Sequence, residues 1–264
     1  MNRSLLLEFL RFCLFTLALS LGLCTLSFLY DAWQKPEFVR RRPLVVLFVG
    51  TDSPGTAARG RADSITLAFL DFRKSTLALL SVPRDAYTDV VGAGFTRINA
   101  SYAKGGVPLL TDTLQRLLAR RIDRFLVLDF KAFEKAADLV GGVDITVDKD
   151  LDYEDRAQGL VIHIKKGRQH MDGHTALMFA RFRMDRGGDM DRIRNQQKLI
   201  RTLAAQTLDL HNLYRLPGWY RQLRPYVQTN VDPQDLYIFI SLFSMNPEAM
   251  VLKTLPGSFA SPYW

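Results

Sequence analysis

An uncharged run rich in leucine and phenylalanine occupies residues 12–30. As a helix it is long enough to cross a hydrocarbon layer of about 30 Å. No small-x-small cleavage pattern follows the run, and Leu23 before Cys24 is too large for a lipoprotein cleavage site, so a retained anchor is favoured over a cleaved signal peptide. Basic residues flank both sides, but the N-terminal arm is very short, which favours a cytoplasmic N-terminus. We therefore expect a single transmembrane helix with the rest of the chain outside the cytoplasm.

The remaining chain has the composition of a folded domain. Hydrophobic residues make up 48% of the protein and charged residues 23%, which is typical of globular proteins. We expect a division into residues 1–43, holding the arm, the span and a linker, and residues 44–264, holding one extracytoplasmic domain. Both cysteines, Cys13 and Cys24, lie in the apolar run, so the exported domain has none and must rely on its core rather than on disulfides.

Strand and helix patterns alternate through the domain, which predicts an α/β fold with a sheet covered by helices. Residues 44–50 are continuously apolar, as in a buried strand. Further strands are predicted at residues 64–70, 76–82, 87–91, 125–130, 143–147, 161–164 and 250–255, and the last is expected to return to the sheet. Helices are predicted at residues 98–103, 108–118, 131–139, 173–183, 189–208 and 233–243. Residues 148–158 are predicted to be a polar loop.

An arginine-rich stretch, residues 181–197, joins two of these helices. Asp189 is well placed to cap the second helix, because its carboxylate can accept free N–H groups of the first turn. Arg192 and Gln196 are four residues apart and therefore share one helix face. Guanidinium groups beside a helix start match phosphate oxygens, so the stretch is interpreted as an anion site. A salt-bridged, solvated loop is the alternative.

The net charge of +8 favours an anionic partner, either a phosphorylated ligand, a lipid headgroup or nucleic acid. Several standard sites are excluded by the residues present. Thr56 and Ala57 replace the Gly-Lys of a nucleotide-binding loop, and no G-x-S-x-G nucleophile motif occurs. His170 and His174 have zinc-ligand spacing, but Gly173 interrupts the helix that would align them, which disfavours a zinc site.

Carboxylates and arginines follow or precede three predicted strands. Asp52 ends the first strand, Arg61 and Asp63 enter the second, and Arg84 and Asp85 follow the third. If these strands are neighbours, their ends meet at one edge of the sheet, where open sheets commonly bind ligands. Carboxylates without histidine or thiol suit Mg²⁺ or Mn²⁺, and with the arginines they predict a pyrophosphate site. Alternatively, the aspartates are turn residues and Arg84 is a surface charge.

Seven motifs occur in order and resemble the LytR-CpsA-Psr family of membrane-anchored bacterial cell-envelope enzymes. They are GTDS, RADSITL, SVPRD, RINASYAKGG, LVGGVDITV, DGHTALMFARFR and GDMDRIRNQQ, and the resemblance covers residues 44–206. The resemblance implies a protein that is anchored in the bacterial cytoplasmic membrane. Its extracytoplasmic part is implied to be a three-layer α/β domain with a central mixed sheet. The implied activity is transfer of a glycopolymer from a polyprenyl-pyrophosphate carrier to a peptidoglycan acceptor, with Mg²⁺ on the pyrophosphate.

The resemblance also implies roles for individual residues. The implied metal ligands are Asp52 and Asp63; the implied catalytic residues are Asp63, Arg61, Arg84 and Arg192; and the implied substrate-binding residues are Asp85, Arg97, Arg181, Arg183 and Gln196. Asp63 or Asp85 is the candidate to assist the acceptor hydroxyl, because no histidine occurs in the motifs. The chain departs from the family at Asp191 and Asn195, where Arg194 is a candidate for the missing cation.

The same motifs are compatible with two other activities. A hydrolase would give the same pyrophosphate to water, and a non-catalytic envelope regulator or binder would only hold it. Nucleic acid is not expected, because an export anchor argues against it and the arginines lack interleaved aromatics. A polyprenyl tail needs an apolar slot, for which residues 125–133 and 176–182 are candidates, although such residues are more often core.

Overall fold

The computed structural model describes residues 42–52, 60–155, 159–182, 188–207, 215–231 and 250–257. The described helices are α3 (Asn99–Leu118), α4 (Phe130–Leu139), α5 (Gly173–Arg181), α6 (Gly188–Thr207), α7 (Leu216–Leu223) and the short 3-10 helix η2 (Arg224–Tyr226). The strands are β1 (Leu44–Thr51), β2 (Ala62–Asp71), β3 (Thr76–Val82), β4 (Tyr87–Val90), β5 (Gly94–Arg97), β6 (Arg124–Asp129), β7 (Val143–Val147), β8 (Leu151–Asp155), β9 (Leu160–Ile164), β10 (Gly167–Met171), β11 (Val227–Thr229) and β12 (Val251–Thr254).

A six-stranded sheet with the order β11-β6-β1-β2-β3-β12 forms the centre of the domain. β1 runs antiparallel to β2 and parallel to β6, and β3 runs antiparallel to β2 and parallel to β12. The expected mixed sheet is therefore confirmed, and the last strand does return to it.

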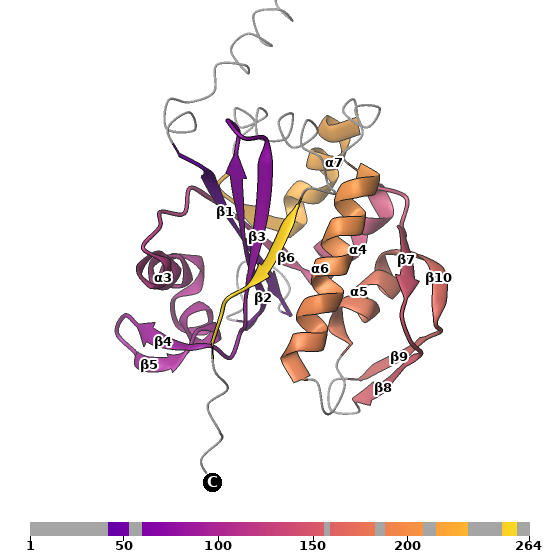
Figure 1. Ribbon diagram of the computed structural model, residues 1–264, viewed down its shortest axis with the longest axis horizontal. Helices are drawn as coiled ribbons and strands as arrows, with labels where there is room; N and C mark the ends of the chain where they lie inside the picture. Colours follow the sequence, from indigo (N-terminus) through magenta and orange to yellow (C-terminus); the bar gives the residue numbers. More distant parts are fainter. Residues whose placement is uncertain are drawn as a thin grey trace, which may run out of the picture.

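Helices cover both faces of this sheet, with α3 on one side and α6 on the other (Figure 1). Alternate residues of β1 enter two different cores. Val45, Leu47 and Val49 pack with α3 residues such as Leu110, whereas Leu44 and its alternates face the core that includes Ile200 of α6. Burial on both faces explains why the first strand is apolar throughout rather than alternating.

A second lobe packs outside α6 and consists of α4, α5 and the hairpins β7–β10 and β8–β9 (Figure 1). Its core contains Ile145, Ile162 and Phe179. Gly173, the first residue of α5, lies against α4, and a Cβ there would meet the Glu134 carbonyl oxygen at 2.1 Å. Only glycine permits this approach, which fixes the position of α5 and hence of Arg181 at its end.

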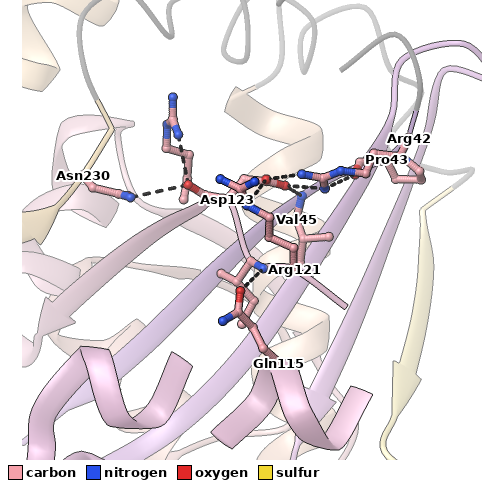
Figure 2. Close-up of polar contacts among 9 residues, drawn as sticks. Arg42, Pro43, Val45, Gln115, Arg121, Asp123 and Asn230 are labelled. Carbon is pink, nitrogen blue, oxygen red and sulfur yellow. Dashed lines mark hydrogen bonds and ion pairs between the residues drawn. The ribbon is translucent and has the colours of Figure 1, made fainter. Parts of the chain in front are cut away.

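The amino end of the sheet is held by one buried carboxylate, that of Asp123 (Figure 2). Arg42 donates to both of its oxygens, from Nη1 at 2.9 Å and Nη2 at 2.5 Å, and the Val45 N–H donates at 3.0 Å. Arg121 adds an ion pair at 3.9 Å. The hydrogen bond to Asp123 is the main cause that raises the pKa of Arg42. These contacts tie the start of β1 to the start of β6.

Some predicted elements differ from the structure. Residues 151–155 of the predicted polar loop form β8, because Leu151 and Tyr153 face the lobe core while Asp152 and Glu154 face outward. The hairpin strands β5 and β10 and the helix α7 were not predicted. The two helices predicted at residues 98–103 and 108–118 form one element, α3, with a break at Gly106 (φ 63°).

Two predictions lie outside the described residues: the transmembrane helix at residues 12–30 and the helix at residues 233–243. Within the part of the chain that the structure describes, no helix is long and apolar enough to cross a membrane.

Candidate functional site

The carboxyl ends of β1, β3, β6 and β12 meet at one edge of the sheet, where β2 begins. Thr51 at the end of β1 is paired with Asp129 at the end of β6 and with Ala62 at the start of β2. Ile65 of β2 is paired with Val82 at the end of β3. The charged residues after β1, before β2 and after β3 are therefore brought to the same edge, as the sequence predicts.

A β-bulge lies at this edge and contains Asp63. Gly50 is paired with Ser64, but the next residue, Thr51, is paired with Ala62, so Asp63 is the extra residue in β2. A Cβ on Gly50 would lie 3.2 Å from the Ser64 Cβ, so glycine eases the close approach. Bulges redirect the side chain that they carry and are common beside active sites.

Ion pairs join two arginines and two aspartates across this edge. Arg84 Nη1 donates to Asp63 Oδ1 at 2.5 Å, and Arg84 Nε lies 3.4 Å from Asp85 Oδ2. The other oxygen of Asp85 lies 3.6 Å from Arg97 Nη1. Arg84 and Asp63 are mostly buried, whereas Asp85 and Arg97 are exposed. The network therefore runs from the sheet edge to the solvent.

Asp52 and Arg61 lie on either side of residues 53–59 in the sequence, which the structure does not describe. The Arg61 backbone N–H donates to Asp52 Oδ1 at 3.2 Å, which fixes the Asp52 carboxylate beside the start of β2. Both side chains are exposed. Asp52 is thus held near the bulge by the backbone of Arg61.

The predicted metal ligands Asp52 and Asp63 come from adjacent strands. Among the described residues, no group of three or more His, Cys, Asp or Glu side chains is arranged to hold a metal. Mg²⁺ is commonly bound by one or two carboxylates together with substrate phosphate oxygens and water. The donor set therefore fits Mg²⁺ only as a site that phosphate oxygens complete, and it does not fit an all-protein cage.

The first half of α6 packs over the same edge. Gln196 accepts from Ser64 Oγ at 3.1 Å and donates from Nε2 to the Ala180 carbonyl at 3.4 Å. Gln197 Nε2 donates to Ser81 Oγ at 3.1 Å. These amides fix α6 against β2, β3 and α5. Contact of Gln196 with phosphate stays a prediction, while its contacts in the structure give it a positioning role.

Arg192, one turn before Gln196 on α6, has only 4% of its surface exposed. A buried guanidinium beside a set of strand ends is unusual, because charged side chains are rarely buried without a structural or functional reason. The helix itself begins at Gly188, so Asp189 lies in the first turn and not at the N-cap position that the sequence predicted.

Arg181 and Arg183 were both predicted to bind substrate. Arg181 is in the last turn of α5, with its guanidinium carbon 4.5 Å from the centre of the Phe130 ring, a cation–π contact that holds it near the start of α4. Arg183 lies outside the described residues.

Two buried groups at the edge were not assigned roles from the sequence. Tyr102 of α3 is hydrogen-bonded to Thr51, and burial raises the pKa of Tyr102 more than that bond lowers it. Asp129 ends β6 and caps α4 by accepting from the Ala132 N–H at 2.7 Å. Tyr102 is part of the motif RINASYAKGG, and its place in that motif is the sequence signal that could have assigned it to the edge.

The apolar segments considered for a lipid tail belong largely to cores. Ala176, Phe179 and Phe182 are buried in the second lobe, so the core interpretation is confirmed for them. A pocket of about 300 Å³ opens instead near Val107 and Phe125. It lies at the amino end of β6, beside Asp123, and is therefore at the opposite end of the sheet from the candidate site.

The fold and site together define a class: a mixed-sheet α/β domain with an arginine-rich anion site at the carboxyl edge. The LytR_cpsA_psr family model matches residues 31–262, and the chain belongs to this family.

The chain is similar to two curated relatives and to the solved structure of one of them. It is 34% identical over 194 residues to "Regulatory protein MsrR" of Staphylococcus aureus strain COL, covering 73% of this chain and 58% of that protein. It is 31% identical over 199 residues to "Polyisoprenyl-teichoic acid--peptidoglycan teichoic acid transferase TagV" of Bacillus subtilis strain 168, covering 73% and 51%. The crystal structure of B. subtilis TagV has 28% identity, a TM-score of 0.72, and coverage of 84% and 88%. The chain thus spans little more than half the length of these curated relatives.

Proposed function

We propose that this protein is a phosphotransferase that moves a glycopolymer from a polyprenyl-pyrophosphate carrier to a peptidoglycan acceptor. The proposal includes a single N-terminal membrane anchor, a cytoplasmic N-terminus and a domain that works outside the bacterial cytoplasmic membrane. It also includes Mg²⁺ bound at Asp52 and Asp63 together with the pyrophosphate.

The observation that carries the proposal is the convergence of arginines at the carboxyl edge. Arg84 and Arg97 are linked through Asp85, and Arg61 lies beside Asp52. The buried Arg192 lies on α6 one turn before Gln196, which contacts Ser64 next to the bulge. Guanidinium groups match phosphate oxygens in planar, two-point contacts. Several of them around one edge suit a ligand with two phosphates better than a single carboxylate.

The relatives support the same class of reaction. TagV is named a teichoic acid transferase that acts from a polyisoprenyl carrier to peptidoglycan. Charged residues from three of the family motifs, Asp63, Arg84 and Arg97, are linked by ion pairs at one edge of the sheet, with Asp85 between the two arginines. MsrR is named a regulatory protein, which keeps regulation as an outcome to be tested.

In the proposed reaction, an acceptor hydroxyl attacks the phosphorus that carries the polymer. The new bond joins the acceptor oxygen to that phosphorus, and the bond to the bridging oxygen breaks. Polyprenyl phosphate leaves, and the hydroxyl proton passes to a carboxylate, for which Asp85 and Asp63 are the candidates. Arg84 orients both carboxylates, because it contacts each of them.

The arginines stabilise the charge that develops on the leaving phosphate. A bound Mg²⁺ would act as a Lewis acid and neutralise phosphate oxygens. The mostly buried position of Arg84 and Arg192 strengthens their contribution, since electrostatic interactions are larger where water is excluded.

The test is a transfer assay with purified full-length protein, lipid-linked pyrophosphoryl polymer and a soluble peptidoglycan fragment. Polymer–fragment product and polymer released in water are measured side by side, with and without chelator. Wild-type product that Arg84→Ala abolishes, and that Arg116→Ala on the outer face of α3 leaves unchanged, supports the transferase. Release into water alone would favour the hydrolase, and binding without turnover would favour a regulator.

A further inference from the structure

The hairpin β4–β5 carries an exposed aromatic pair beside the candidate site. Phe95 is 74% exposed and Tyr87 is 55% exposed, and their ring centres are 5.8 Å apart. Both rings remain in water although the other face of the hairpin is packed, with Thr88 and Val90 buried. Exposed apolar groups gathered at one place commonly mark an interaction site.

The register explains why the two rings share a face. Tyr87 is paired with Arg97, and Asp89 is paired with Phe95. Since alternate residues of a strand point to the same side, these four side chains occupy the outer face of the hairpin. We call this face, formed by Tyr87, Asp89, Phe95 and Arg97, the hairpin platform. It is apolar at its rings and charged at its edges.

The hairpin platform is continuous with the site. Arg97 contacts Asp85, which contacts Arg84. The hairpin base is closed by two backbone hydrogen bonds, from Ile98 to the Ala86 carbonyl at 2.8 Å and from Asn99 to the Arg84 carbonyl at 3.1 Å. Arg84 is therefore fixed by the same strands that present the rings, so a molecule on the platform is held in register with the site.

We propose that the hairpin platform binds the sugar rings of the peptidoglycan acceptor, an inference that rests on the proposed function. A sugar ring has an apolar C–H face that packs on an aromatic ring and a rim of hydroxyl, amide and carboxylate groups. Tyr87 and Phe95 match the face, while Asp89 and Arg97 match the rim. The electron-rich ring faces favour contact with C–H groups.

The geometry assigns the platform to the acceptor rather than to the lipid-linked donor. The hairpin lies on the α3 side of the sheet edge, whereas α5 and α6 lie on the opposite side (Figure 1). Arg181 belongs to α5 and Arg192 to α6. A donor pyrophosphate held by Arg84 and by Arg192 of α6 leaves the outer face of the hairpin, which lies beyond Asp85, open to the acceptor. A sugar on the platform places its hydroxyl toward Asp85, a candidate to accept the proton.

A bilayer is the other surface that exposed aromatic rings could contact. Asp89 and Arg97 share the face with the rings, and charged groups are costly to bring into hydrocarbon. The alternation of ring and charge therefore favours a sugar over lipid tails.

The test compares Phe95→Ser and Tyr87→Ser with Tyr220→Ser, a control that removes an exposed aromatic ring from α7 (40% exposed). Full-length protein in detergent is titrated with a soluble peptidoglycan fragment, and the acceptor and donor KM are measured. We expect each platform variant to raise the fragment Kd and the acceptor KM about three- to tenfold, as a ring contact contributes. In the two platform variants, kcat, the donor KM and the thermal unfolding temperature should stay unchanged. Phe95→Trp, which keeps an aromatic ring, should bind the fragment as the wild type does. Tyr220→Ser should have no effect on either KM.

Three results would contradict the proposal that the hairpin platform binds the acceptor. The first is equal fragment affinity in all variants. The second is a defect in donor KM instead of acceptor KM. The third is a defect seen only when the donor is presented in phosphatidylglycerol vesicles, which would indicate bilayer contact. If wild type binds the fragment through the platform but transfers no polymer to it, the proposed function fails while the platform stands.

Discussion

The two ends of the central sheet use the same chemical pair, arginine with aspartate, in opposite ways. At the amino end, Asp123 is 3% exposed and receives two bonds from Arg42 and one from the Val45 N–H. At the carboxyl end, Asp63 and Asp85 are partly exposed and share Arg84. One carboxylate is saturated by its own chain, whereas the others leave part of their oxygens accessible.

The two ends of the sheet also differ in their excess of positive charge. The carboxyl end carries five arginines, Arg61, Arg84, Arg97, Arg181 and Arg192, and four aspartates, Asp52, Asp63, Asp85 and Asp129, of which Asp129 is engaged as the cap of α4. Charges that satisfy one another stabilise a fold, whereas an excess of one sign favours a ligand of the other sign. The comparison therefore predicts that mutations at the carboxyl end lower activity and that mutations at the amino end lower the stability of the fold.

The largest expected effect is that of Arg84→Ala. The change removes the contacts to Asp63 and Asp85 together, so we expect transfer to fall by about 10²–10³, the range for a lost charge-stabilising donor. Thermal unfolding by circular dichroism should change little, because the carboxylates of Asp63 and Asp85 both keep access to water. Arg116→Ala is the control. Equal losses in the two variants would contradict a localised site.

Arg192→Ala should cost about tenfold to a hundredfold in kcat/KM, because a charge-assisted bond to phosphate contributes about 1.5–3 kcal/mol. Arg192→Lys should recover only part of this loss, since an ammonium lacks the planar fork. Arg168→Ala, in the second lobe, is the control. Full activity in the lysine variant would argue that charge alone matters at this position.

Asp52→Ala tests the metal. We expect loss of Mg²⁺-dependent transfer, with the unfolding temperature preserved because the side chain is exposed. Isothermal titration of Mg²⁺ with a soluble pyrophosphate should show weaker coupled binding in the variant than in Asp112→Ala. Activity that survives both the mutation and excess chelator would exclude metal assistance.

At the opposite end, Asp123→Ala should lower the free energy of unfolding by about 2–4 kcal/mol, because the buried Val45 N–H and the Arg42 guanidinium lose their partner. Transfer per folded molecule should be unchanged. Urea unfolding measures the first quantity and active-site-normalised kinetics the second. A fall in turnover without loss of stability would show that the two ends are coupled.

The smallest effect concerns the cap of α5. Asp172 accepts from the Thr175 N–H at 2.8 Å, and this bond is the main cause that lowers the pKa of Asp172. A lowered folded-state pKa adds stability above the unfolded value of about 4, and this stability is lost as pH falls through the folded value. Asp172→Ala should cost about 1 kcal/mol at pH 7, and the difference from wild type should shrink at pH 3.

Much of the fold could be predicted because its signals are local. The apolar run at residues 44–50 and the strand–helix alternation predict a buried sheet, and the charged residues flanking three strands predict that they gather at one edge of it. The bulge that redirects Asp63 could not be predicted, because it depends on the pairing of two strands and not on composition. β8 was missed for a related reason, since its acidic outer residues hide the alternation of Leu151 and Tyr153.

The clasp between Arg42 and Asp123 also has a mechanical consequence. β1 lies in the middle of the sheet between β6 and β2, so a pull on the chain before Arg42 is directed along β1 and against two neighbouring strands at once. Such a load shears their hydrogen bonds together instead of opening them one after another. The clasp must break first, and it passes tension to β6 as well as to β1. If the protein is anchored through the segment before Arg42, as proposed, force on that segment would be borne at the amino end of the sheet, opposite the candidate site.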